Sequence, residues 1–249
     1  MDTDYFPVPN CKQQQLIDDF VGDLSKCFQI NIRTVCLQDL WEDTAPFDAH
    51  GQPLQDYLRN VGQNSFFYDF YHSSDSFREE YERKYHRAPA VNAVTKWRWK
   101  IAKGISKAQR DDAVRRLDVY KKWLLEQVVV GNHPIVILPV MDAVPTYRDD
   151  PPSSPATQEA WHQLWMAPIL GSPEVTLPIG QMPYHSRVSE REEQLPVAIS
   201  LMGLPGTDIS LINTAKTVLE KSGRPCRVAT GREMFVEDDW EMVERTALF

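Results

Sequence analysis

The sequence contains the residue types that catalyse reactions or bind metals, but their spacing does not form a known reactive motif. The six histidines lack HxH and HxxxH spacing, and the four cysteines lack the CxxC spacing of many zinc sites. No GxSxG turn exposes a nucleophilic serine, and neither GxGxxG nor GxxxxGK[ST] offers a loop for nucleotide phosphates. We therefore expect no metal and no cofactor. A Ser-His-Asp triad needs no proximity in sequence, so residue order leaves that arrangement open.

Adjacent serines occur twice, at Ser73-Ser74 and at Ser153-Ser154. The first pair lies in an aromatic-rich helical region and the second in a proline-rich loop. The chain has 11 glycines, none of them adjacent to another, so neither pair has the flexible neighbours that expose backbone N–H groups as an oxyanion hole. Two acid pairs, Asp149-Asp150 and Asp238-Asp239, lie in polar contexts where solvation is the simpler interpretation.

Composition indicates a globular protein and excludes several classes of partner. The 249 residues are 42% hydrophobic and 10% aromatic, which is ordinary for a folded chain. The formal net charge of -8 argues against a nucleic-acid partner, which needs a basic face. The basic residues between Lys96 and Lys122 alternate with apolar ones, so we interpret them as a solvated helix face. Core or interface packing, rather than base stacking, is expected for the aromatic residues.

Targeting signals are not evident in the sequence. The start, MDTDYFPVPN, lacks the basic and apolar regions of a secretory signal. No run approaches the roughly 18 apolar residues of a membrane span. Cysteines Cys11, Cys27, Cys36 and Cys226 show no disulfide framework. We expect a cytoplasmic protein without a membrane partner.

Residues 1–131 are expected to be mainly helical. Apolar spacing predicts helices over 12–28, from Pro53 onward, over 91–101 and over 106–130, with Ser106 as an N-cap. Phe77, Tyr81 and Tyr85 fall on one face of a further helix. Alternation over 30–37 predicts a short strand.

Residues 132–231 are expected to form a strand-rich core, followed by a C-terminal tail over 232–249. The apolar run 135–140 predicts a buried strand, and Pro139 places it at a strand end or a sheet edge. Residues 147–157, YRDDPPSSPAT, are the clearest loop, and a helical turn should follow around Trp161, Leu164 and Trp165.

The stretch 167–219 gives the most specific architectural pattern. Residues 174–177 and 197–201 are apolar and bounded by Pro and Gly, which predicts two short strands. The polar segment 181–194 between them predicts a surface loop or crossover. Asp208 is expected to N-cap a helix that stops at Gly223 and Pro225.

This stretch resembles the amidase signature superfamily. The resemblance lies in Gly171-x-Pro173-x4-Pro178-x-Gly180, in Leu195-Pro196-Val197-Ala198-Ile199-Ser200-Leu201-Met202-Gly203, and in Pro205-Gly206-x-Asp208-x-x-Leu211-Ile212. Order and gaps agree with the C-terminal strands and last long helix of that family over roughly 55 residues. Agreement upstream is more diffuse and is most similar to fungal members.

The resemblance implies an α/β fold, with a mixed β-sheet flanked by helices as in the C-terminal half of the amidase signature fold. Residues 1–249 would be a single partial amidase-like domain. Such a half lacks strands supplied by the other half, so an exposed sheet edge and apolar patches are expected.

Family enzymes hydrolyse amides with a serine activated by a lysine and by a second serine on a cis peptide bond, held in a segment like GGSSGG. No such segment occurs here, so we expect no catalytic residue in this chain. The favoured interpretation is a truncated or degenerate amidase that acts as a binding or accessory protein. One alternative is part of an active serine amidase, completed by a missing N-terminal half or a partner chain. Another is a non-catalytic protein-interaction module.

By the same resemblance, His185 and Arg187 in the 181–194 segment would lie near the substrate side, and we carry them as pocket-rim candidates. Surface solubility explains both residues about as well. Expected partners are a complementary amidase half, a second copy of the chain, or a small amide substrate if the assembly is active.

Overall fold

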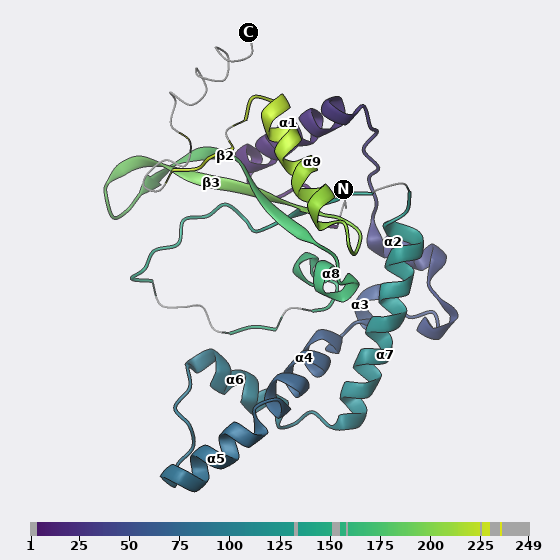
Figure 1. Ribbon diagram of the computed structural model, residues 1–249, viewed down its shortest axis with the longest axis vertical. Coiled ribbons are helices and arrows are strands. Elements are labelled where there is room, and N and C mark those ends of the chain that lie inside the picture. Colours follow the sequence, from purple (N-terminus) through teal and green to yellow (C-terminus); the bar gives the residue numbers. More distant parts are fainter. Residues whose placement is uncertain are drawn as a thin grey trace. The chain divides into compact units, whose positions relative to one another are not determined.

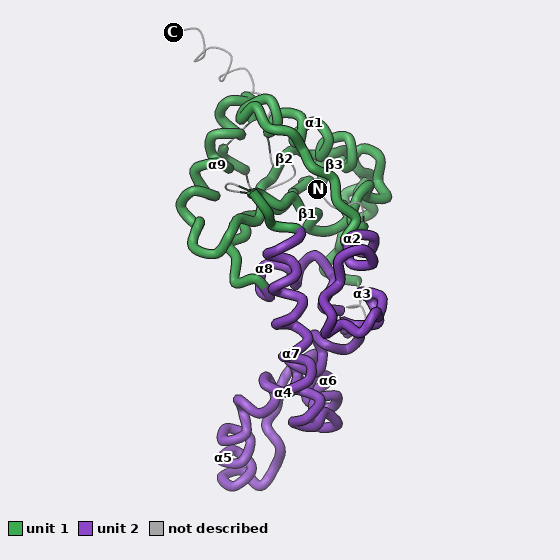
Figure 2. The backbone as a smooth tube through the Cα atoms, turned by 90° about the vertical axis from the view of Figure 1, so that its right-hand side faces the viewer, with its two compact units in different colours: residues 1–37, 128–150, 170–249 green, residues 38–127, 151–169 purple. Residues whose placement is uncertain are grey.

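The computed structural model describes residues 4–131, 134–150, 155–157, 159–224, 226–229 and 235 (Figure 1). The chain divides into two compact units (Figure 2). Unit 1 comprises residues 1–37, 128–150 and 170–249, and unit 2 comprises residues 38–127 and 151–169. Each unit is therefore assembled from segments far apart in the sequence. No helix in the described ranges is long and apolar enough to cross a membrane.

Helices dominate unit 2, and unit 1 contains the sheet. Unit 1 holds α1 (Cys11–Phe28), β1 (Val136–Pro139), β2 (Glu174–Ser186), β3 (Arg191–Met202) and α9 (Asp208–Lys221). Unit 2 holds η1 (Phe47–Ala49), α3 (Leu54–Tyr57), α4 (Val61–His72), α5 (Asp75–Tyr85), α6 (Ala93–Ala102) and α7 (Lys107–Trp123). Three elements span the unit boundaries: α2 (Leu37–Thr44), the π-helical η2 (Leu124–Val128) and α8 (Gln163–Leu170).

The described strands form one sheet in the order β1-β3-β2, which confirms the α/β class. Its pairings are all antiparallel rather than mixed. Strands β2 and β3 form a long hairpin in which Glu174 faces Met202 and Ser186 faces Arg191, with a bulge between Pro178 and Gly180. The predicted strand over 135–140 is confirmed as β1, and Pro139 lies at its end on an edge strand, where a missing N–H is tolerated.

Helices α1 and α9 lie next to each other against the sheet (Figure 1). The predicted helix over 12–28 is confirmed, and its buried residues Ile17, Phe20 and Leu24 join one apolar cluster. That cluster also includes Val197, Ile199 and Leu201 of β3 and Leu211, Ala215, Val218 and Leu219 of α9. The alternate residues 197, 199 and 201 of β3 point to the same face because the side-chain period of a strand is two.

Four buried aromatic residues form the centre of unit 2. Trp41 lies 4.9 Å from Trp123, 5.4 Å from Tyr57 and 6.1 Å from Tyr120, measured between ring centroids. Helix α7 brings Tyr120 and Trp123 to this cluster. The predicted N-cap Ser106 is confirmed: Ser106 and Gln109 form a capping box at the start of α7.

The strand predicted over 30–37 is wrong. Val35 forms only an isolated bridge, and Leu37 begins helix α2. Ile30 remains 42% exposed. Alternation describes one strand alone, whereas a sheet needs a neighbour that satisfies its backbone groups, and 30–34 has no ladder partner in the described part of the chain.

The loop predicted over 181–194 is also wrong. The two predicted short strands extend into a continuous hairpin, with only a tight turn between Ser186 and Arg191. A polar sequence misled the prediction because an antiparallel hairpin satisfies its backbone groups by pairing even where its side chains face water. At Pro196, β3 has β2 as its one described neighbour because β1 covers only Ile199–Met202.

The predicted cap at Asp208 is displaced by one residue. Thr207 is the N-cap and its side chain makes no capping bond, while Asp208 is the first residue of α9. Its carboxylate still lies in the first turn, where its negative charge interacts favourably with the positive end of the helix dipole. The predicted stop is confirmed at Gly223, which has a φ of 68°.

Phe77, Tyr81 and Tyr85 share one face of α5 as predicted, with the centroids of neighbouring, mutually tilted rings 5.9 and 4.6 Å apart. These three rings are not part of a hydrophobic core, because α5 has no buried residue and Phe77 is 49% exposed. The helical region predicted from Pro53 is interrupted, since α3 ends at Tyr57 and α4 starts at Val61 after Asn60 in the left-handed conformation. Asn132, Ser153-Ser154, Pro225, Asp238-Asp239 and most of the tail 232–249 lie outside the described residues.

Candidate functional site

The sequence-predicted candidates His185 and Arg187 lie at the end of the β2–β3 hairpin. The His185 imidazole Nδ1 is 3.2 Å from Glu192 Oε1, and both side chains are more than half exposed. Arg187 forms an ion pair with Asp150, its guanidinium lies 4.3 Å from the Tyr147 ring centroid, and its backbone N–H donates to the Tyr147 hydroxyl. The structure thus gives both candidates local partners at an exposed turn.

The remaining hydrogen bonds of this turn hold its shape. Tyr184 and Ser189 both donate their hydroxyl protons to the Glu193 carboxylate, at 2.7 and 2.6 Å. The bond to Glu193 raises the pKa of Tyr184 above its ordinary value. A carboxylate whose ordinary pKa is about 4.3 is a weak base for a hydroxyl, so this network stabilises the turn without activating Ser189 as a nucleophile.

The ion pair at the turn should contribute little to stability. We expect Arg187→Ala to change the free energy of unfolding by about 0.5 kcal/mol or less, because the Arg187 side chain is 58% exposed. Arg224→Ala is the contrasting variant, since Arg224 is 10% exposed, pairs with Asp23 and donates to the Ile179 carbonyl. Its loss should cost about 2–3 kcal/mol. Urea unfolding measures both changes. Equal losses in the two variants would contradict the assignment of Arg187 to a weak, exposed ion pair and of Arg224 to a strong, buried one.

A serine–lysine pair is not formed by the described serines. Ser73 and Ser74 donate to the carbonyl of Phe70 at the end of α4. None of the hydrogen bonds among described residues joins a lysine amine to a serine hydroxyl. Within the same residues, no group of three His, Cys, Asp or Glu side chains is placed to hold a metal ion.

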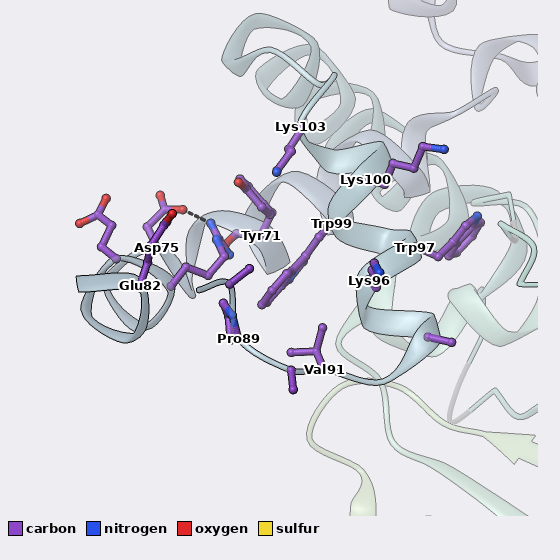
Figure 3. Close-up of a pocket in the computed structure, with 15 residues that line it drawn as sticks. Tyr71, Asp75, Glu82, Pro89, Val91, Lys96, Trp97, Trp99, Lys100 and Lys103 are labelled. Atoms are coloured by element: carbon purple, nitrogen blue, oxygen red, sulfur yellow. Dashed lines mark hydrogen bonds and ion pairs between the residues drawn. The ribbon is translucent and has the colours of Figure 1, made fainter. Parts of the chain in front are cut away.

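Unit 2 contains a hollow of about 970 Å³ (Figure 3). It is bounded by the end of α4, by α5, by α6 and by the loop 86–92 that joins them. Ala88, Pro89, Ala90 and Val91 make the loop side apolar. Trp99 extends from α6 toward Pro89, and Tyr71 lies on the other side of Trp99 from Pro89 (Figure 3). The lining therefore combines apolar and aromatic side chains with seven charged ones, Asp75, Arg78, Glu79, Glu82, Lys96, Lys100 and Lys103.

Arg78 fixes the aromatic wall of the hollow. Its guanidinium lies 3.5 Å from the Tyr71 ring centroid and 4.8 Å from that of Trp99, within cation–π range. It also donates to the Tyr71 carbonyl at 2.7 Å and pairs with Asp75. These bonds compensate the Arg78 charge and the Asp75 charge inside the wall, so neither is free to attract a ligand.

The sequence interpretation missed this hollow. A signal for charged faces was present in the sequence, because two sets of like charges follow i, i+4 and i+7 spacing. The sets are Lys96, Lys100 and Lys103, and Asp75, Glu79 and Glu82. The lysines were interpreted as a solvated face, and they are indeed exposed. Whether the two charged faces lie on one hollow depends on the path of the loop between the helices.

Comparison with known proteins shows which solved structures have a similar fold. No family model matches the sequence. The structure is similar to that of a bacterial aryl acylamidase belonging to the amidase signature enzymes family, with a TM-score of 0.54 and 14% identity. The chain shares the fold of part of an amidase signature enzyme. The match covers 98% of this chain and 44% of the acylamidase chain.

Two further structures were found, both of a 6-aminohexanoate cyclic dimer hydrolase, one of them complexed with substrate. Their TM-scores are 0.48 and 0.44, at 14% and 15% identity, and the match covers 43% and 41% of those chains. The chain therefore spans less than half the length of each of these three structures.

Proposed function

We propose that this chain is an amidase-family protein that lacks its own catalytic residues and acts as a binding or accessory protein. The observation that supports the proposal is the shared fold over 98% of the chain. In addition, the hydroxyls of Ser73, Ser74 and Ser189 donate to carbonyl or carboxylate oxygens and not to a lysine. In this proposal residues 1–249 form one partial, fungal-type amidase domain in the cytoplasm, and His185 and Arg187 are surface groups.

Purified alone, the chain should not hydrolyse amides. We expect p-nitroacetanilide, an aryl amide, to be cleaved no faster than in buffer, and a fluorophosphonate probe to label no serine. Both follow because hydroxyl nucleophiles need an adjacent base. Release of nitroaniline and mass spectrometry of the treated chain measure this. Phosphonate-sensitive hydrolysis that is lost when the labelled serine is replaced would overturn the proposal.

A second candidate function is part of an active amide hydrolase whose serine–lysine apparatus comes from another polypeptide. It is favoured by the open edge of β1, which pairs only with β3 among the described strands. Met141 and Val144, just after β1, are 68% and 60% exposed, as expected of a surface that another chain covers. A reading frame immediately upstream in the gene that encodes a Gly/Ser-rich segment, and hydrolysis on co-expression, would favour this function over the first.

A further inference from the structure

The hollow between α5 and α6 has the size and lining of a small-molecule site. Ligand pockets commonly enclose about 300–1,000 Å³ and combine apolar walls with a few polar groups. At about 970 Å³, this hollow lies at the upper end of that range. It lies wholly within unit 2, between elements that are consecutive in the chain.

Uncompensated charges of opposite sign line the two walls. Lys96 lies on α6 three residues before Trp99, and Lys103, the residue that caps the end of α6, lies four residues after it. Glu79 and Glu82 lie on α5. None of these four side chains forms an ion pair within the described part of the chain, although other basic side chains of unit 2 pair with carboxylates.

The aromatic wall between these charges offers a surface against which a flat or apolar group can pack. The guanidinium of Arg78 holds the rings of Tyr71 and Trp99, and Trp99 extends toward Pro89 on the loop side of the hollow (Figure 3). The buried indole N–H of Trp99 has no hydrogen-bond acceptor in the described structure. An unpaired buried donor is costly, and a small rotation of the ring would let an acceptor on a bound molecule remove that cost.

We propose that this hollow binds a small dipolar molecule with an apolar or aromatic centre, its carboxylate toward Lys96 and Lys103 and its amine toward Glu79 and Glu82. A short peptide has this chemistry. A simple anion would meet the two glutamates, and a simple cation would meet the lysines, so neither complements both walls. Three extended residues span about 10 Å, so a tripeptide is small enough for a hollow of about 970 Å³.

The test uses the tripeptide Ala-Phe-Ala and two modified forms, titrated into the full chain in a calorimeter at low ionic strength. Acetylation of the N-terminus removes the positive charge, and amidation of the C-terminus removes the negative one. We expect the unmodified peptide to bind most tightly and each modified form to bind about fivefold more weakly, as for the loss of one exposed ion pair. Raising the salt to 1 M should reduce these differences.

Charge variants identify which wall binds the carboxylate of the peptide and which binds its amine. Lys96→Gln combined with Lys103→Gln should weaken the unmodified and acetylated peptides and leave the amidated one unchanged. Glu79→Gln combined with Glu82→Gln should weaken the unmodified and amidated peptides and leave the acetylated one unchanged. Glu80→Gln on the same helix and Lys122→Gln on α7 are matched controls, since both residues are exposed and lie outside the hollow.

Circular dichroism checks that all variants keep their helices, which is expected because every replaced side chain is exposed. Equal affinity for the three peptides would overturn the proposal. So would an effect of Glu80→Gln equal to that of Glu79→Gln combined with Glu82→Gln. Absence of binding at millimolar peptide would overturn it too. The amide-hydrolysis test is independent, because a catalytic chain could still bind the peptide and a non-catalytic one could fail to.

Discussion

Trp41→Ala should lower the free energy of unfolding by about 3–5 kcal/mol. Trp41 is 1% exposed and contacts Tyr57, Tyr120 and Trp123, so its removal leaves a cavity among three large rings. Its indole N–H donates to the Gln52 carbonyl at 2.9 Å, and that acceptor would lose its partner. Urea unfolding followed by far-ultraviolet circular dichroism measures the effect, because helices make up most of unit 2.

Phe47→Ala is the matched control for this variant. Phe47 is also aromatic and lies six residues away, but it is 90% exposed. We expect a change of about 0.5 kcal/mol or less, the usual range for a surface substitution. A Trp41→Ala protein that unfolds at the same urea concentration as the Phe47→Ala protein would contradict the assignment of Trp41 to the centre of unit 2.

Gln13→Leu is expected to destabilise unit 1 by about 2–3 kcal/mol, although it replaces a polar residue with an apolar one of similar size. The Gln13 side chain is 1% exposed. Its amide donates to the Met141 carbonyl and accepts from the backbone N–H of Ala143, each at 2.8 Å. It therefore attaches the segment after β1 to helix α1. Leucine leaves both backbone groups without that partner, and Ala143 is too buried for water to replace it.

Gln15→Leu makes the same substitution two residues along α1, on the exposed side of the helix. Its amide bonds only to Asp19 within the helix, so we expect a loss of about 0.5 kcal/mol or less. Hydrogen exchange at Ala143 gives a local measurement: its amide should exchange much faster in Gln13→Leu and at the original rate in Gln15→Leu. Unchanged protection in Gln13→Leu would show that another group holds the segment.

Several elements could be predicted from the sequence because a local rule specifies each of them. Helix α1 follows from its apolar stripe, and the start of α7 follows from Ser106, whose capping bonds lie within three residues. Pro139 marks the end of β1 because proline lacks the N–H that a further ladder bond requires. The order and gaps of Pro and Gly around residues 171–206 led to the amidase signature fold, which the structure shares.

Elements that depend on a distant partner were predicted poorly. Residues 181–194 are polar and were assigned to a loop, yet their backbone pairs along the hairpin. Residues 30–37 alternate like a strand, but Val35 forms only an isolated bridge and Leu37 begins helix α2. The candidates His185 and Arg187 came from family resemblance, and the structure places them at an exposed turn with local partners.

The sequence by itself determined helix α1, the start of α7, the proline at the end of β1 and the absence of a known catalytic motif. Only the tertiary structure decided which charged faces meet. Glu79, Glu82, Lys96 and Lys103 are ordinary surface residues in the sequence, and their periodicity fixes a helix face but no neighbour. The turn over 86–92 brings the two faces to one hollow, because the direction of a loop sets how consecutive helices approach each other.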